Sequence, residues 1–182
     1  MLQQTQVSRV LAFYPRFLKR FPTLHRLADA PPRRVMESWE GLGYYARARN
    51  LHKLARHVTR GNAAGNGGAL PSQPAELRKL PGVGAYTAGA VASFAFEQRA
   101  AAVDTNVARV LSRVFAPRLS PKRPRDLKRL WSIAEAVLPR TGKAAWTHNQ
   151  ALMELGALVC TARVKRCTAC PVSALCASSE TP

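Results

Sequence analysis

Acidic residues are scarce in this chain. Its 182 residues include 10 Asp and Glu but 28 Lys and Arg, which gives a formal net charge of +18. Each basic side chain placed on a phosphate releases counterions, so this imbalance favours a polyanionic partner. The alternative is a folded protein whose positive surface is only solvated.

Long apolar runs and a secretory signal are also missing. No stretch approaches the roughly 20 apolar residues of a membrane-spanning helix, so we expect no membrane partner. The first residues do not follow the pattern of a secretory signal, and we expect a cytoplasmic, nucleoid-associated location in a bacterial cell. Thiols stay reduced there, so the four cysteines are expected to be ligands rather than disulfides.

The residues that are present indicate a folded helical protein. An apolar fraction of 47% and a length near that of a single domain allow a sizeable core. Helical spacing predicts that residues 1–21 bury one face, made of Val7, Val10, Leu11, Tyr14, Phe17, Leu18 and Phe21. A later helix carries a basic stripe, which is either a nucleic-acid backbone contact or a solvated face: Arg49, Lys53, Arg56 and Arg60. Residues 62–74, rich in Gly, Asn, Ser and Pro, are expected to form a loop.

The central stretch is Leu-Pro-Gly-Val-Gly at residues 80–84. Pro81, Gly82 and Gly84 do not fit inside one helix, so one helix ends near Leu80 and another begins near Ala85. The glycines permit positive φ, and the free N–H groups of the next helix face outward, which would suit a phosphate. The alternative is an ordinary turn between packed helices.

Asp104 follows an apolar run and precedes a helix whose inner face is apolar. This position predicts an N-cap, the ordinary structural role of an aspartate there. Together with the Leu-Pro-Gly-Val-Gly turn, the sequence Val-Asp-x-Asn-Val-x-Arg-Val resembles the helix-hairpin-helix DNA glycosylases related to endonuclease III. The resemblance implies that Asp104 flanks the sugar under attack and that the hairpin grips one phosphate, with Gly82, Val83, Gly84 and Thr87 as DNA-binding residues.

The same resemblance implies an all-α fold of two helical lobes. The first would comprise residues 1–118, with the helix-hairpin-helix at about 75–97, and the second residues 119–182. Both lobes would border a groove for DNA.

Four cysteines close the chain in the pattern Cys-x6-Cys-x2-Cys-x5-Cys. Zinc is the general interpretation of four close cysteines, and four thiolates also suit an iron–sulfur cluster. This spacing, just after a helix, resembles the loop that closes the endonuclease III superfamily. It implies a 4Fe-4S cluster in the loop 160–176, bound by Cys160, Cys167, Cys170 and Cys176, with the cluster shaping a basic loop.

Two further stretches resemble the adenine DNA glycosylases within that superfamily: Met-Leu-Gln-Gln-Thr-Gln-Val at the start, and Gly-Leu-Gly-Tyr-Tyr-Ala-Arg-Ala-Arg-Asn at residues 41–50. The resemblance implies DNA contacts by Leu2, Gln4, Thr5, Tyr44 and Arg47, with Gln4 and Tyr44 inserted into the base stack. Gln150 would read the flipped adenine. The implied partner is double-stranded DNA with an A:8-oxoguanine or A:G mismatch, bound by a monomer. For Tyr44 the alternative is packing in the core.

A glycosylase that also cuts the strand needs a lysine where this chain has Tyr86, so we expect a monofunctional enzyme. The resemblance implies that Asp104 stabilises the sugar cation, that Asn106 helps to hold the sugar or water, and that Tyr86 forms a hydrogen bond to the general acid. The family's general-acid glutamate would precede Met1, so we expect the 182 residues to bind DNA but cleave poorly. One alternative is a thymine or uracil mismatch glycosylase, which Asp104-Thr105-Asn106 keeps open although Gln4, Tyr44 and Gln150 weigh against it. The other is a non-catalytic DNA-binding fragment.

Overall fold

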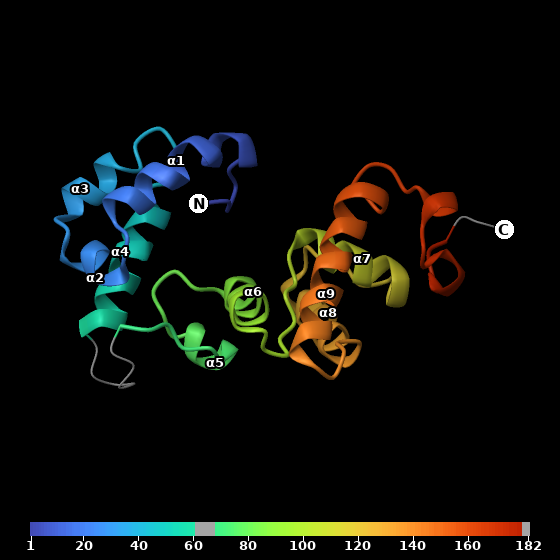
Figure 1. The fold of residues 1–182 in the computed structure, drawn as a ribbon. Helices are drawn as coiled ribbons and strands as arrows, with labels where there is room; N and C mark the ends of the chain where they lie inside the picture. Colours follow the sequence, from blue (N-terminus) through green and yellow to red (C-terminus); the bar gives the residue numbers. More distant parts are fainter. Residues whose placement is uncertain (61–67, 180–182) are drawn as a thin grey trace. The chain divides into compact units, whose positions relative to one another are not determined.

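The computed structural model describes residues 1–60 and 68–179, and Figure 1 shows their helices. The α-helices are α1 (Val7–Arg20), α2 (Leu24–Asp29), α3 (Pro32–Glu37), α4 (Ala46–Arg60), α5 (Pro74–Leu77), α6 (Ala85–Phe96), α7 (Thr105–Phe115), α8 (Pro124–Ala136) and α9 (Gly142–Glu154). A π-helical turn (η1, Leu155–Val159) and two 3-10 turns (η2, Cys167–Ala169; η3, Ser173–Leu175) follow α9. These ranges contain no strand, only a single bridge between Cys160 and Lys165, which confirms the all-α prediction. No described helix has the length and apolarity needed to cross a membrane.

The chain divides into two compact units. Unit 1 comprises Met1–Pro71 and Glu76–Val83, and unit 2 comprises Ser72–Ala75 and Gly84–Pro182. The predicted boundary at residue 118 lies inside unit 2, because Leu111 on α7 and Leu130 on α8 are buried in the same core. Of the predicted loop over residues 62–74, residues 62–67 lie outside the described part of the chain.

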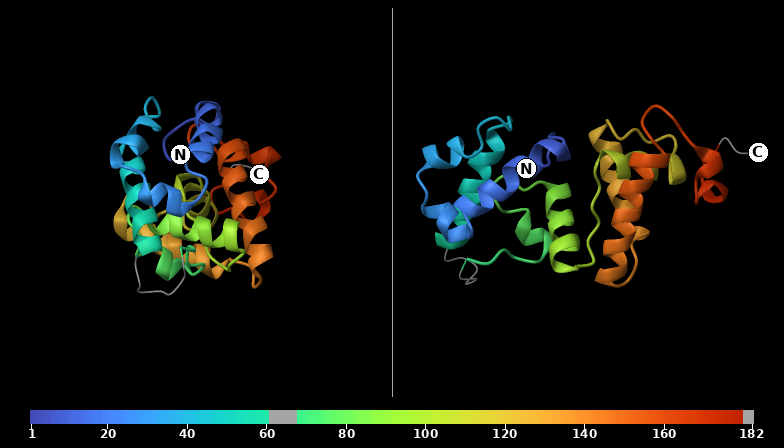
Figure 2. Two further views of the ribbon diagram at one scale, coloured as in Figure 1. Left: turned by 60° about the vertical axis from the view of Figure 1, so that its left-hand side comes forward. Right: turned by 45° about the horizontal axis from the view of Figure 1, so that its top comes forward.

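The core of unit 1 forms around Trp39, which is 1% exposed. The rings of Phe17 and Trp39 meet edge-on with 5.7 Å between their centroids, and Phe21 meets Phe17 at 5.0 Å. Helix α4 packs against α2 and α3, and Figure 2 shows the same neighbours. Ala48, near the start of α4, is fully buried in this core.

The predicted buried face of α1 is only partly correct. Val10, Phe17 and Phe21 are buried. Four other members of that face are exposed: Val7, Leu11, Tyr14 and Leu18. The apolar side chains cover more of the helix circumference than the core around Trp39 buries, so helical spacing overestimated the buried face.

The core of unit 2 is built on α7, which packs against α8, α9 and the π-helical turn. The inner face of α7 is apolar and buried, at Val107, Ala108, Val110, Leu111 and Val114. Helix α9 also packs against α6. The N-terminal end of α7, where Asp104 lies, is therefore held by neighbouring helices of the same unit.

Residues 80–84 form the predicted turn between α5 and α6. Val83 N donates to Leu80 O at 3.2 Å, and α6 begins at Ala85, after Gly84. Gly82 has a φ of +75°, and an added Cβ would lie 2.5 Å from Asn50 Cβ, so only glycine fits there. Gly84 has a φ of −86°, so of the two glycines only Gly82 uses the left-handed region.

Candidate functional site

Two unit 1 residues in the left-handed backbone region border one groove. Gln4 has a φ of 57° and Tyr44 a φ of 48°, which costs free energy for residues other than glycine. Both residues and Thr5 line the groove, whose volume is about 470 Å³. Tyr44 is 59% exposed, so it is not packed in the core. Leu2 is also exposed, and its carbonyl accepts a hydrogen bond from Thr5 N at 3.3 Å.

Arg47, at the start of α4, bonds to both stretches that form the groove. Its guanidinium donates to Thr5 Oγ1 at 2.8 Å and to Gly43 O at 3.1 Å. It also donates to the carbonyls of Met1 and Gln3. Burial is the main cause that lowers the pKa of Arg47 from its ordinary value. The predicted DNA-contacting arginine is thus engaged inside the protein.

The main chain of the predicted phosphate-binding turn is accessible to solvent. Gly82 and Gly84 are exposed, and Val83 is half-buried. Gly84 is the N-cap of α6, whose first turn carries Thr87. Gly82 and Val83 belong to unit 1, whereas Gly84 and Thr87 belong to unit 2.

Asp104 caps the N-terminus of α7, as predicted. Its Oδ1 accepts from Val107 N at 2.7 Å, and its Oδ2 accepts from Asn106 Nδ2 at 3.3 Å. The two donors hold this carboxylate in one orientation at the N-terminus of α7. Asp104 is half-buried, so the side chain keeps access to solvent.

Tyr86, in the first turn of α6, interacts electrostatically with Asp104. Burial first, and the charge of Asp104 second, raise the pKa of the Tyr86 phenol above its ordinary value. The residue is 38% exposed, so the phenol is partly open to solvent. It therefore keeps its proton at neutral pH and can donate a hydrogen bond. Unit 2 thus brings Tyr86, Asp104 and Asn106 together.

Gln150, predicted to read a base, lies on α9 beside Asn149. Asn149 is 2% exposed, and its Oδ1 accepts from Ala102 N at 3.2 Å. Its Nδ2 donates to Ser93 Oγ at 2.9 Å and to Ala100 O at 2.8 Å. These bonds tie α9 and α6 to the segment that leads into α7. Sequence reasoning missed Asn149, whose only signal was its place beside Gln150.

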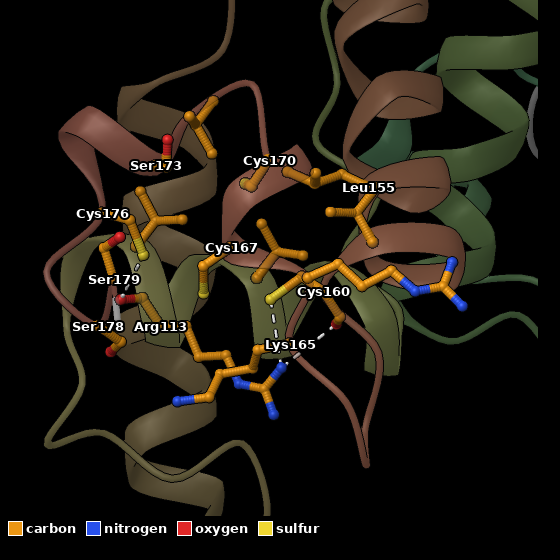
Figure 3. A pocket seen from close by; sticks show the side chains of 15 residues that line it. Arg113, Leu155, Cys160, Lys165, Cys167, Cys170, Ser173, Cys176, Ser178 and Ser179 are labelled. Carbon is orange, nitrogen blue, oxygen red and sulfur yellow. Dashed lines mark hydrogen bonds between the residues drawn. The ribbon is translucent and has the colours of Figure 1, made fainter. Parts of the chain in front are cut away.

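The four cysteines line one recess, shown in Figure 3. Cys160, Cys167, Cys170 and Cys176 are free thiols and half-buried. The described residues include no group of three or more cysteine, histidine or acidic side chains placed to hold a metal ion. Four soft, reduced sulfur donors around one space nevertheless fit an iron–sulfur cluster or zinc, so the donor set suits the predicted group.

Two arginines of α7 that sequence reasoning missed bond to this region. Arg113 Nη1 lies 3.2 Å from Cys160 Sγ, and Arg109 Nε donates to Cys160 O at 3.0 Å. Arg109 Nη2 also donates to Gly156 O at 2.6 Å and to Asn106 Oδ1 at 2.8 Å. Arg109 is the arginine of the Val-Asp-x-Asn-Val-x-Arg-Val stretch, and Arg113 lies four residues further along the same helix, so both side chains are on the same face.

Comparisons with known proteins agree with this geometry. Residues 1–135 match the family model of the HhH-GPD superfamily of base excision DNA repair proteins. The adenine DNA glycosylase of Buchnera aphidicola subsp. Baizongia pistaciae is 40% identical over 98% of this chain and 48% of that protein. The adenine DNA glycosylase of Homo sapiens is 44% identical over 99% of this chain and 32% of that protein. The chain therefore spans less than half the length of these relatives.

Solved structures show the same likeness. A thermostable thymine-DNA glycosylase superposes with a TM-score of 0.85 at 31% identity, covering 98% of this chain and 80% of that chain. An endonuclease III from a non-covalent DNA complex superposes with a TM-score of 0.78 at 27% identity, covering 98% and 79%. The resemblance seen in the sequence is confirmed. The chain belongs to the HhH-GPD superfamily of base excision DNA repair proteins.

Proposed function

We propose that this chain is the core of a monofunctional adenine DNA glycosylase, which removes adenine mispaired with 8-oxoguanine or guanine. The observation that carries the proposal is the carboxylate of Asp104, half-buried at the N-terminus of α7 and held by Val107 N and Asn106 Nδ2. A phenol stands where a strand-cutting enzyme needs a nucleophilic amine, and it lies near a carboxylate held by two donors. The relatives named adenine DNA glycosylase, at 40% and 44% identity, support adenine as the base.

The proposed reaction hydrolyses the N-glycosidic bond. The bond between C1′ and adenine N9 breaks, its electron pair goes to the purine, and the purine takes up a proton from solvent. Water attacks the sugar cation at C1′ and gives up a proton. Asp104 supplies a negative charge beside that cation, already oriented by Val107 N and Asn106 Nδ2 before the bond breaks. Tyr86 keeps its proton and donates a hydrogen bond, and Gln150 contacts the flipped base.

Duplex DNA is the proposed partner of a monomeric protein. The net charge of +18 and three exposed basic residues of α4 (Arg49, Lys53 and Arg56) favour a phosphate backbone. Arg60 of the same stripe instead pairs with Asp29 at 3.0 Å. A structural relative named endonuclease III was solved in a complex with DNA, which supports this partner. Gln4 and Tyr44 are proposed to insert into the stack.

We also propose that the four cysteines hold a 4Fe-4S cluster. Bound there, it would give the loop between Cys160 and Cys176 one shape, and Arg113 would offset thiolate charge at Cys160. We expect anaerobically purified protein to contain iron and sulfide and to absorb at ~400 nm, as thiolate-bound clusters do. Cys167→Ser should lower the iron content, whereas Ser173→Ala, in the same recess, should not. A colourless protein with bound zinc would contradict the cluster.

The test of function compares two duplexes with an abasic analogue opposite 8-oxoguanine, one cationic and one neutral. Because a cation resembles the transition state, we expect wild-type protein to bind the cationic duplex at least about tenfold more tightly. Asp104→Asn should abolish the preference while keeping the fold, since asparagine caps a helix about as well as aspartate. This readout does not depend on a general acid.

Catalysis is then measured as release of free adenine from an A:8-oxoguanine duplex, with the strand left uncut. Equal affinity of wild-type protein for the cationic and neutral duplexes would contradict the role of Asp104. Strand cutting without added base would contradict the monofunctional assignment.

A thymine mismatch glycosylase is the second candidate, because a thymine-DNA glycosylase is the structural relative with a TM-score of 0.85. The same release assay with a T:G duplex separates the two candidates. Release of thymine but not of adenine would favour this second function.

A further inference from the structure

The described hydrogen bonds of the Arg47 side chain all go to oxygens of two turns in unit 1. The first turn (residues 1–5) supplies the carbonyls of Met1 and Gln3 and the hydroxyl of Thr5. The second turn (residues 41–45) supplies the carbonyls of residues 42, 43 and 44, at 3.4, 3.1 and 3.5 Å. One guanidinium therefore bridges the turn next to it and a second turn that lies more than forty residues away from Arg47 in the sequence.

The guanidinium is also anchored on the core. Its carbon lies 5.5 Å from the ring centroid of Trp39, which is 1% exposed, and 5.3 Å from that of Tyr44. Trp39 Nε1 in turn donates to Gly43 O at 3.2 Å. The planar fork of arginine suits several fixed acceptors at once, which the single ammonium of lysine does not.

The two turns share an unusual backbone conformation. Three residues other than glycine have positive φ in the described part of the chain, and two of them are Gln4 and Tyr44. Such conformations persist only where the surroundings hold them. Arg47 bonds directly beside each, at Gln3 and Thr5 in the first turn and at Gly43 in the second.

We propose that Arg47 is a positioning residue: it clamps the two left-handed turns that present Gln4 and Tyr44, and it does not contact a DNA phosphate. The part that concerns DNA rests on the proposed function, because these two side chains are proposed to enter the base stack. The role differs from the direct DNA contact that the resemblance implied for Arg47.

Arg49, on the same helix, is the control for the substitutions of Arg47. Its side chain is exposed and makes no hydrogen bond or ion pair with any other described residue. It is therefore available for a phosphate. The logarithm of the binding constant falls linearly with the logarithm of the salt concentration. Removing a phosphate contact reduces the magnitude of this slope by about 0.9, whereas removing a positioning residue leaves the slope unchanged.

The first measurement needs no DNA. Amide hydrogen exchange is followed in wild type, Arg47→Lys, Arg47→Ala and Arg49→Ala. We expect exchange at residues 1–6 and 41–46 to be at least about tenfold faster in both Arg47 variants and unchanged in Arg49→Ala. If Arg47→Ala does not fold, Arg47→Lys carries the test. Unchanged exchange at both turns would overturn the proposal.

The second measurement is binding to duplexes that carry 2′-fluoro-deoxyadenosine, which resists cleavage, opposite 8-oxoguanine or thymine. We expect Arg47→Lys to bind the mispair about tenfold more weakly, as if one stacked base were lost, with an unchanged salt slope. Arg49→Ala should weaken both duplexes alike and lower the slope. A slope lowered in Arg47→Ala as in Arg49→Ala would overturn the proposal. If wild-type protein binds neither duplex, the proposed function fails, and the exchange experiment still decides the role of Arg47.

Discussion

Asp104 uses its two carboxylate oxygens for different partners. Oδ1 accepts from Val107 N at 2.7 Å and closes the helix cap, while Oδ2 accepts from Asn106 Nδ2 at 3.3 Å. The structural role expected of an aspartate at this position is therefore present, and it also orients the carboxylate. A cap and a catalytic charge do not exclude each other here, because the cap holds the side chain in place.

Tyr86 provides a prediction at the scale of one residue. Burial and the charge of Asp104 both disfavour the phenolate, so we expect the pKa of Tyr86 to lie above its ordinary value of 10.0. Asp104→Asn removes the smaller cause and should lower this pKa without returning it fully to the ordinary value. The measurement is the ultraviolet absorbance of tyrosinate during alkaline titration. The titration curve of the Tyr86→Phe variant is subtracted, so that the difference reports Tyr86 alone.

The same shift sets the sign of a stability effect. The unfolded chain loses the Tyr86 proton near 10.0 and the folded chain at higher pH. The contribution of Tyr86 to the free energy of unfolding is thus complete below pH 10.0, and it is lost as the pH rises through the pKa of the folded state. If Asp104→Asn raised the pKa of Tyr86, the result would contradict the electrostatic interaction between the two residues.

At the scale of the elements, the π-helical turn after α9 controls how closely α9 approaches α7. A Cβ added to Gly156 would lie 2.8 Å from Asn106 Cβ, and Gly156 O accepts from Arg109 Nη2 at 2.6 Å. Asn149 makes a second close connection, from α9 to Ser93 on α6. The helix that carries Gln150 is therefore held at both α6 and α7.

Gly156→Ala tests this close approach. The added methyl group must push α9 from α7, so we expect the free energy of unfolding to fall by about 1–3 kcal/mol. Urea unfolding measures the change. The neighbouring exposed substitution Ala157→Ser is the control and should stay within about 0.5 kcal/mol of wild type. A similarly small change in Gly156→Ala would show that the helices are not in contact there.

At the scale of the whole molecule, charge and folding are separate properties. Each unit has its own apolar core, around Trp39 in unit 1 and around Leu111 in unit 2. The net charge of +18 comes from side chains that are mostly outside those cores, since no described Lys or Arg is fully buried. Neutralising a surface arginine should therefore affect partner binding more than folding.

Salt dependence tests the polyanion partner. With about six phosphate contacts, duplex affinity should fall by about 10³ between roughly 50 mM and 200 mM salt. Arg56→Gln should lower the slope by about 0.9, since Arg56 is exposed on the α4 stripe. Arg60→Gln should lower it less, because Arg60 pairs with Asp29. Affinity that does not change with salt would argue that the positive surface is only solvated.

Local chemistry made several features predictable from the sequence. The start of α6 at Ala85 and the cap at Asp104 were both predicted, because proline and glycine interrupt a helix and aspartate reaches the N–H three residues on. The order of the motifs identified the superfamily, which the family model over residues 1–135 confirmed. These features depend on neighbouring residues, so a linear sequence contains the information.

Only the tertiary structure decided which side chains are engaged inside the protein. The bonds of Arg47 to Met1 and Thr5 and of Arg109 to Gly156 each join distant parts of the chain. The exposure of Leu11 on α1 likewise depends on how much of that helix the Trp39 core covers. A basic or apolar residue shows by itself neither how many partners surround it nor whether they are protein or solvent, because packing between remote segments determines both.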